Sequence, residues 1–379
     1  MLLDDDTAFA SFLKHLAGAE AYALDAEFHG ENSYYPQLAV LQLATPGQVA
    51  VVDATTVDVR PLAAVLDGPA LMVAHAGEQD LQVLLRATGT IPSRLFDTQV
   101  AAGFLGFSPP SLAKLVADLL GVRLEKGARM SDWFKRPLTA EQVAYAAADV
   151  DHLLELRAVI DERLTATGRL SWAFEESERR RRVREPDVDT AWWRLKGVRQ
   201  LRGPGRGVAQ ELAAWRERAA MAADKPARRI LADEAVLLLA ERPPRSAADM
   251  PKSRLFDSRR LSRDVVDGLV AAIARGRDLP KAGLRLPPDT DLPPQLQPLA
   301  SLLSAWVAQQ SRDIAVDPTL LGTRADIEAY LRRVPDCHLG KGWRAELIGA
   351  SLARIVAGDA GVAYDGAGGL VLVDRAAAP

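Results

Sequence analysis

Short apolar runs alternate with segments of helical periodicity over the first 170 residues of the chain. The apolar runs predict five strands, at residues 21–28, 38–43, 49–52, 71–74 and 95–96. The first three follow one another closely enough to form an antiparallel meander. Helical periodicity predicts helices at residues 57–66, 78–87, 111–120 and 139–163. Alternating strands and helices indicate an α/β domain, to which we assign residues 1–174.

Helical periodicity without a strand pattern then continues from residue 191 for more than a hundred residues. It predicts a helical domain at residues 188–276, with helices at 208–222, 227–242, 246–250 and 262–275. Residues 277–298 hold six prolines, which indicates a linker. Residues 299–375 predict a second helical domain, with helices at 299–310, 323–334 and 343–357 and a closing hairpin at 362–364 and 370–373.

Length and composition limit the class of protein. A chain of 379 residues suggests two or three domains, and the single cysteine excludes a disulfide framework or a cysteine-rich zinc site. No apolar run approaches the roughly 20 residues that cross a bilayer. The first residues are acidic where a secretory signal would be basic. We therefore expect a cytoplasmic monomer with no membrane partner.

The charge is unevenly distributed along the chain. The net charge of −3 excludes a uniformly basic nucleic-acid coat. Residues 1–174 carry 13 basic and 22 acidic side chains, whereas residues 175–229 carry 15 and 9. A polyanion would be repelled by the first segment unless cations are bound there, and attracted by the second. On charge alone, a solvated linker is the simpler explanation for the basic segment.

Two candidate acids belong to a predicted strand, and a third follows another strand. Asp25 and Glu27 are two residues apart on a strand, so their side chains project from the same face. They repel each other and resist desolvation unless a cation compensates them, although a strand end facing water would also tolerate them. Asp80 follows the fourth strand at the start of a helix, where the helix dipole by itself favours an acid.

The predicted helix at residues 139–163 supplies a fourth acid. Thr139 and Gln142 have the spacing of a capping box at its start. Tyr145 and Asp149 are four residues apart and therefore lie on one helix face, separated by three alanines that keep the surface low. A solvated acid beside a packing tyrosine is the alternative interpretation.

Together these motifs resemble the DEDD exonuclease superfamily and, within it, the ribonuclease D family. The motifs are residues 24–28 followed by 34–38, then 75–81, 96–99 and 145–150. Their order, spacing and context agree with the family, and a tyrosine four residues before the last aspartate marks one subgroup. The resemblance implies a ribonuclease H-like mixed sheet with flanking helices.

The resemblance also implies a metal site. Asp25, Glu27, Asp80 and Asp149 would hold two Mg²⁺ or Mn²⁺ ions, for which carboxylate oxygens are suitable ligands. Two ions about 4 Å apart can clamp a scissile phosphate. Tyr145 would orient the attacking water, since a phenol with a pKa near 10 is a poor base.

Substrate contacts are expected from Phe28, Gln37 and His75. Packing is the competing role for Phe28 and His75. Asp97 and Gln99 are expected to support the site structurally.

The first helical domain resembles the HRDC domain, a nucleic-acid auxiliary found in RecQ-type helicases and ribonuclease D. The resemblance rests on residues 192–197, 208–216, 224–226 and 230–234. It implies phosphate contacts by Arg199, Arg202 and Arg206. Residues 342–347 resemble the C-terminal region of ribonuclease D, which suggests that residues 299–375 are a second, diverged HRDC-like bundle.

The resulting hypothesis is a 3′→5′ exoribonuclease that releases nucleoside 5′-monophosphates from structured RNA, with tRNA precursors as the expected substrate. One alternative is an exonuclease acting mainly on DNA, because the same site hydrolyses both and no identified residue reports on the 2′-hydroxyl. Another is a non-catalytic RNA-binding protein, against which the complete set of acids argues.

Overall fold

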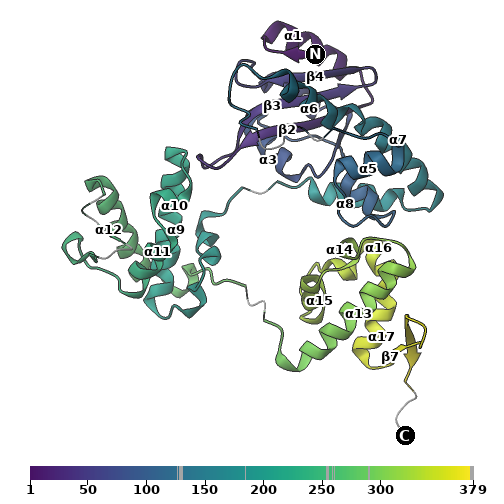
Figure 1. Cartoon of the computed structure of the whole chain (residues 1–379). Coiled ribbons are helices and arrows are strands. Elements are labelled where there is room, and N and C mark those ends of the chain that lie inside the picture. The colour runs from purple at the N-terminus through teal and green to yellow at the C-terminus, as the bar shows by residue number, and fades with distance from the viewer. Residues whose placement is uncertain are drawn as a thin grey trace. The chain divides into compact units, whose positions relative to one another are not determined.

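The computed structural model in Figure 1 describes residues 1–125, 127, 131–183, 185–252, 256–257, 259, 261–288 and 291–375. The chain forms two compact units. The first comprises Met1–Glu27, Leu38–Arg182 and Thr290–Pro379, and the second comprises Phe28–Gln37 and Val183–Asp289. Both ends of the chain therefore contribute to one unit, and the middle of the chain forms most of the other.

The first unit contains a six-stranded mixed sheet (Figure 1). Its strand order is β1-β4-β3-β2-β5-β6, and the strands are β1 Leu2–Leu3, β2 Ala21–His29, β3 Gln37–Thr45, β4 Gln48–Asp53, β5 Leu71–Ala74 and β6 Leu95–Asp97. β3 and β4 pair antiparallel, whereas β1 with β4, β2 with β5 and β5 with β6 pair parallel. The five predicted strands are thus confirmed, and the short β1 is an addition.

The register of the parallel strands brings functional segments together. Every residue of β5 is buried, as is typical of a central parallel strand. Its last residue, Ala74, pairs with Asp97 at the end of β6. The turn after β5 therefore lies beside Asp97, at the edge of the sheet where α3 begins.

Helices cover the sheet of the first unit. They are α1 Asp6–Ala17, α2 Ala63–Leu66, α3 Glu78–Thr88, α4 Thr98–Gly103, α5 Leu112–Leu120, α6 Ala140–Asp151, α7 Leu153–Ala166 and α8 Leu170–Arg180. The predicted capping box of Thr139 and Gln142 is present at the start of α6.

The prediction of one helix over residues 139–163 was wrong, because His152 separates α6 from α7. α6 packs on β4, whereas α7 packs on β5, α4 and α5. A straight helix could not follow both surfaces, so a change of direction at His152 lets each helix bury its own apolar face.

The C-terminal helices share a core with the sheet domain in this same unit. They are α13 Gln297–Asp313, α14 Pro318–Leu321, α15 Arg324–Leu331, α16 Gly342–Arg344, a π turn at Ala345–Gly349 and α17 Ala350–Ala357. Trp343 stacks on Trp172 at 5.5 Å and meets Phe104 edge-on at 5.0 Å. The predicted closing hairpin is confirmed as β7 Ala360–Tyr364 and β8 Leu370–Asp374.

The second unit is a small helical bundle. Its elements are η2 Val188–Arg194, η3 Val198–Gln200, α9 Pro204–Ala223, α10 Ala227–Ile230, α11 Asp233–Glu241, η4 Ala247–Asp249 and α12 Arg263–Asp278. The prediction of one helix over residues 227–242 was wrong, because Leu231 and Ala232 are extended and separate α10 from α11. α9 and α12 approach closely at Gly207, where a Cβ would lie 2.3 Å from the carbonyl oxygen of Gly276.

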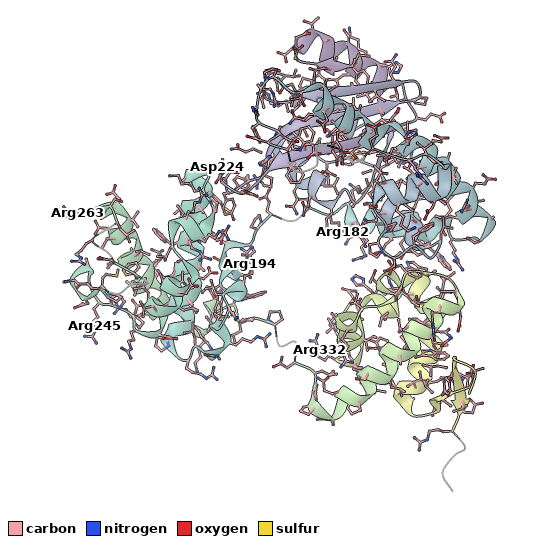
Figure 2. All side chains as sticks on the ribbon, in the orientation of Figure 1. Arg182, Arg194, Asp224, Arg245, Arg263 and Arg332 are labelled. Atoms are coloured by element: carbon pink, nitrogen blue, oxygen red, sulfur yellow. The ribbon has the colours of Figure 1, made fainter. Side chains whose placement is uncertain are left out.

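Residues 28–37 belong to the bundle unit through a set of polar contacts. Asp224, in the left-handed conformation at the C-terminal end of α9 (Figure 2), accepts the backbone N–H of Tyr34 at 3.0 Å. Asp224 also accepts the side-chain amide of Gln37 at 3.0 Å, and the Tyr34 hydroxyl donates to Glu217 at 2.7 Å. Asp224 also accepts the backbone N–H of Tyr35 at 3.3 Å, so the end of α9 holds this segment by two backbone and two side-chain hydrogen bonds.

Candidate active site

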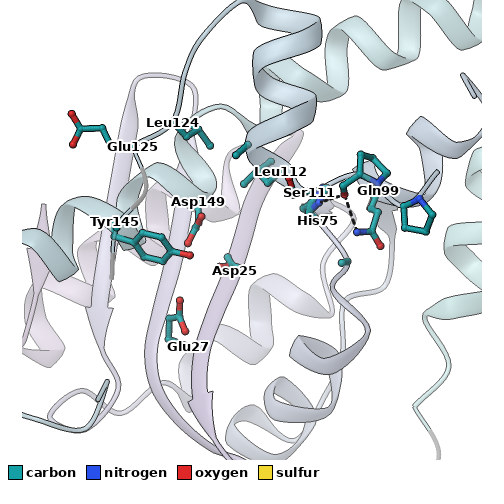
Figure 3. Close-up of a pocket in the computed structure, with 15 residues that line it drawn as sticks. Asp25, Glu27, His75, Gln99, Ser111, Leu112, Leu124, Glu125, Tyr145 and Asp149 are labelled. Atoms are coloured by element: carbon teal, nitrogen blue, oxygen red, sulfur yellow. Dashed lines mark hydrogen bonds between the residues drawn. The ribbon is translucent and has the colours of Figure 1, made fainter. Parts of the chain in front are cut away.

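Three carboxylates of the first unit converge at one place. Asp25 and Glu27 project from one face of β2, because the side chains of a strand alternate, while Leu24 and Ala26 between and beside them are buried. Asp149 on α6 joins them, and one oxygen from each of the three carboxylates lies within 4.8 Å of the others. The sequence spacing on a strand and on a helix has therefore produced one acidic cluster (Figure 3).

Tyr145 extends this cluster from one turn earlier on α6. Its hydroxyl points toward Asp25 and Asp149 (Figure 3). The four-residue spacing on the helix accounts for this, since residues i and i+4 are neighbours on its surface. A hydroxyl that can donate and accept therefore lies beside three acceptor-only groups.

A cavity of about 850 Å³ opens over the cluster. It extends past Leu112 to a second group of polar side chains, formed by His75, Gln99 and Ser111 (Figure 3). Pro110 and Leu124 add apolar surface to its wall. A space of this volume, with acids at one end and mixed polar and apolar walls at the other, can admit a nucleotide.

The electrostatics of the cluster call for a cation. Burial raises the pKa of Asp25 well above its ordinary value, and the charges of Asp80, Asp149 and Glu27 raise it further. A proton or a metal ion relieves such crowding. All the donors are carboxylate oxygens, the ligands that Mg²⁺ and Mn²⁺ prefer, so these residues fit a divalent cation.

Asp80 lies close to this cluster but is not one of the three converging acids. It is in the first turn of α3, only 7% exposed, and does not line the cavity. Burial, followed by the charge of Asp97, raises its pKa to about 7. Its charge is nevertheless the largest electrostatic influence on Asp25, so the two carboxylates are near neighbours.

Asp97 organises the turn that leads to Asp80. It is 2% exposed and caps α4 by accepting the backbone N–H of Gln99 and Val100. The same carboxylate accepts the backbone N–H of Ala76 and of Gly77, each at 3.1 Å. The structural role expected of Asp97 is therefore confirmed. Gln99 supports the cavity wall by donating to the Pro110 carbonyl at 3.0 Å.

His75 lines the cavity, and both of its ring nitrogens have partners in the protein. Nδ1 lies 3.0 Å from the Thr98 hydroxyl, and Nε2 lies 3.2 Å from the Pro110 carbonyl oxygen. Burial lowers the pKa of His75 despite the opposing charge of Asp97. His75 therefore packs with satisfied polar groups and borders the cavity, and its contact with substrate stays a prediction.

The other predicted substrate contacts lie in the second unit. Phe28 is half-buried, and Gln37 binds Asp224. Arg202 donates to the carbonyls of Arg199 and Leu201, and Arg206 donates to Leu201 as well. These arginines therefore stabilise the turn before α9, and Arg199 and Arg202 are exposed on it.

Sequence reasoning missed part of the cavity wall. Leu112, Leu124 and Ser111 lie on or beside a helix whose periodicity was predicted, but nothing in that pattern distinguishes a cavity-lining residue from an ordinary surface one. Trp133, which does not line the cavity but lies beside the Tyr145 ring, was also missed. It lies in an irregular segment with no periodic signal.

Comparisons with known proteins agree with this geometry. Residues 2–165 match the family described as 3′-5′ exonuclease, and residues 206–273 match the HRDC domain. The mixed sheet, the acids on β2 and α6 and the first of these matches define a 3′→5′ exonuclease.

Relatives specify the family further. The chain is 34% identical to ribonuclease D of Sphingobium indicum over 370 residues, covering 94% of each chain. It is 35% identical to ribonuclease D of Acidiphilium cryptum, covering 97% of this chain and 95% of the relative. The crystal structure of Escherichia coli RNase D, described as an exoribonuclease involved in structured RNA processing, matches with a TM-score of 0.81 and 29% identity, covering 94% of this chain and 98% of that one. The chain belongs to the ribonuclease D family and is a 3′→5′ exoribonuclease.

Across the part of the chain that the structure describes, no helix combines the length and apolarity needed to cross a membrane.

Proposed function

We propose that Asp25, Glu27, Asp80 and Asp149 bind two Mg²⁺ or Mn²⁺ ions and that this site hydrolyses the 3′-terminal phosphodiester of RNA. The convergence of three carboxylates beside a cavity of nucleotide size is the observation that carries the proposal. The crowding that raises the pKa of Asp25 supports it, because cations would relieve that repulsion. Asp80 enters as the fourth ligand through its closeness to Asp25.

When bound, two divalent ions supply Lewis-acid stabilisation of both the attacking and the leaving oxygen of the phosphodiester. The side chains of the chain provide the rest. The Tyr145 hydroxyl points toward the carboxylates and orients the attacking water. It is not the base, because a phenol with a pKa near 10 stays protonated at neutral pH. The cavity wall between Leu112 and His75 holds the terminal nucleoside, which leaves as a 5′-monophosphate.

The substrate proposed is the 3′ end of structured RNA, with tRNA precursors the first to be tested. The description of the Escherichia coli relative supports structured RNA. The HRDC domain, assigned to residues 188–276, supplies contacts to RNA outside the active site, through Arg199, Arg202 and Arg206. Phe28, Gln37 and His75 remain candidates for contacts to the terminal nucleotides. The protein acts as a cytoplasmic monomer in this proposal.

One experiment tests catalysis, polarity and substrate class together. A tRNA precursor with an extended 3′ end is labelled at its 5′ end in one sample and at its 3′ end in another, and is digested with Mg²⁺, with Mn²⁺ and with chelator. In the presence of metal, we expect the 5′-labelled RNA to shorten stepwise and the 3′ label to be released at once as mononucleotide. With chelator, we expect neither change. A DNA strand of the same sequence is the matched substrate, and its faster degradation would contradict the RNA proposal.

A further inference from the structure

Tyr145 is held from one side by a buried tryptophan that belongs to no predicted motif. The ring centroids of Trp133 and Tyr145 lie 6.1 Å apart, with the ring planes inclined by 37°. Trp133 is 2% exposed and belongs to a small apolar cluster with Val40 on β3 and Val51 on β4. The indole therefore fills the space between the sheet and the side of α6 that carries Tyr145.

The backbone of Gly127 also lies close to Tyr145. A Cβ placed on Gly127 would lie 2.8 Å from Cδ2 of Tyr145 and 3.3 Å from its Cβ. Such distances are shorter than van der Waals contact, so this position tolerates only glycine without a shift of the ring. Trp133 and Gly127 together leave the phenol ring little freedom.

Trp133 is itself fixed by an arginine three residues later. Arg136 donates through Nη1 to the Trp133 carbonyl oxygen at 2.5 Å. It also forms a two-pronged ion pair with Asp53 at the end of β4, through Nε at 2.5 Å and Nη2 at 2.6 Å. It also donates to the carbonyl of Ala39 on β3 at 3.1 Å. One guanidinium therefore ties the segment that carries Trp133 to two strands.

The charge of this anchor is stable at neutral pH. Burial opposes ionisation of Asp53, but hydrogen bonds from Arg136 and Thr55 hold its pKa below the ordinary value. A second tie comes from Gln142 of α6, whose amide donates to the Asp132 carbonyl at 3.3 Å. The segment is thus connected both to the sheet and to the helix that carries Tyr145.

We propose that Trp133 is a positioning residue for Tyr145, and that the Arg136–Asp53 pair keeps Trp133 in place. The inference rests on the proposed role of Tyr145 in orienting water. A hydroxyl that orients a nucleophile must be held to a fraction of an ångström, and a displacement of about 1 Å can lower turnover by about 10²-fold. The packing of Trp133 against the ring of Tyr145 contributes to this precision.

Trp133→Phe is a suitable probe for two reasons. The indole N–H of Trp133 is buried and has no hydrogen-bond partner among the residues that the structure describes, so phenylalanine removes no hydrogen bond seen there. Phenylalanine also keeps an aromatic ring but leaves a gap beside Tyr145. Trp343 is the matched control, since it is 1% exposed and lies in the C-terminal helices away from the cavity. Its indole N–H likewise has no partner within the described part of the chain.

The experiment measures kcat and KM of the full-length enzyme with Mg²⁺ on a single-stranded RNA oligonucleotide. We expect Trp133→Phe to lower kcat at least tenfold with little change in KM. Trp343→Phe should lower the melting temperature about as much as Trp133→Phe does, but leave kcat within twofold of the wild type. Arg136→Lys should lower kcat in the same direction, because lysine cannot form the two-pronged pair with Asp53.

The decisive comparison repeats Trp133→Phe in a Tyr145→Phe background. If Trp133 acts through the Tyr145 hydroxyl, the second substitution should change kcat by less than twofold in that background. An equal loss of kcat in both backgrounds would show that Trp133 only stabilises the fold, and would overturn the inference. Wild-type turnover of Trp133→Phe would overturn it as well.

Failure of the proposed role of Tyr145 gives a different result. In that case Tyr145→Phe alone would retain wild-type turnover, whatever the effect of Trp133→Phe. If Trp133→Phe fails to fold, Arg136→Lys in the two backgrounds provides the same comparison. The rise in melting temperature on adding Mn²⁺ should be unchanged in all variants, because none of them removes a carboxylate of the cluster.

Discussion

The Asp97 carboxylate accepts a hydrogen bond from the backbone N–H of Ala76, a residue whose φ of 59° lies in the left-handed region. A non-glycine residue in that region is strained, and such strain persists only where the surroundings enforce it. Here the enforcing group is a buried carboxylate that also accepts the N–H of Gly77. The strained turn directs the chain into α3, and thereby sets the position of Asp80 near Asp25.

Asp97→Asn tests this relationship. An amide keeps only one acceptor oxygen, so one of the turn N–H groups loses its partner. We therefore expect the free energy of unfolding to fall by about 1–3 kcal/mol. Turnover should fall as well, because Asp80 would no longer be held in place. Asp317→Asn is the control, since Asp317 is a buried cap of α14 away from the cavity. If the control lowers kcat as much as Asp97→Asn does, Asp97 has only a general effect on stability.

Asp149→Asn should reduce nuclease activity by more than tenfold, as should Asp25→Asn. Each substitution removes a negative donor from a cluster whose charge the bound cations would balance. Asp151→Asn is the matched control, because Asp151 is exposed two residues further along the same helix. The measurement is release of mononucleotides in Mg²⁺. Activity within tenfold of the wild type in Asp149→Asn would remove that residue from the metal site.

The metal-free protein should lose stability as the pH rises. Asp80 has its pKa raised from 3.8 to about 7, and Asp25 is raised in the same direction. A carboxyl group with a raised pKa favours folding below the unfolded pKa, and this contribution disappears as the pH passes through the folded value. Between pH 3.8 and about 7, Asp80 alone accounts for a decrease of up to about 4 kcal/mol.

Melting temperatures in chelator across this pH range check that prediction. Asp80→Asn should flatten the profile and raise the melting temperature at pH 8 relative to the wild type. Addition of Mn²⁺ at pH 8 should stabilise the wild type and have a smaller effect on the variant. If the melting temperature of the wild type in chelator did not decline between pH 5 and 7, the repulsion among the acids would be compensated without a metal ion.

Tyr145→Phe should reduce turnover by about 10²–10⁴-fold, the range typical of acid, base or orienting groups. The ring remains to pack against Trp133, so stability and metal binding should be nearly unchanged. Single-turnover hydrolysis and RNA binding, measured separately, distinguish a loss of chemistry from a loss of affinity. Should turnover stay near normal, Tyr145 is a packing residue.

The basic turn before α9 should govern the salt dependence of RNA binding. Replacing Arg199, Arg202 and Arg206 by glutamine should flatten the slope of log affinity against log salt by about 0.7 per lost phosphate contact for single strands. Because Arg202 and Arg206 also donate to backbone carbonyls, the triple lysine variant is the control that keeps charge but alters these bonds. Equal slopes for the glutamine variant and the wild type would leave this turn as a solvated surface.

Local sequence patterns were sufficient for the sheet and for much of the site. Asp25 and Glu27 could be paired because a strand alternates its side chains, and Tyr145 and Asp149 because a helix places every fourth residue on one face. Those rules operate within one element. They do not determine how far Asp80, at the start of a different helix, lies from the other acids.

Features that depend on distant packing were missed for the same reason. Nothing local shows that helices after residue 290 share a core with Trp172 and Phe104, so the C-terminal region was expected to be a separate domain. The break at His152 follows from two surfaces in different parts of the fold. Trp133 was overlooked because an irregular segment has no period from which a buried position could be inferred.

The division of one unit between the two ends of the chain affects its synthesis. Arg344 forms a buried ion pair with Glu176, so Glu176 has no compensating partner on that side until residue 344 has emerged from the ribosome. At about 5–20 residues per second, residues 183–344 take roughly 8–30 s to translate. During that interval the residues of the sheet and its acids have been synthesised, but Trp172 and Phe104 still lack the contact with Trp343. The first unit of this nuclease therefore completes its fold only after the second unit and residue 344 behind it have been synthesised.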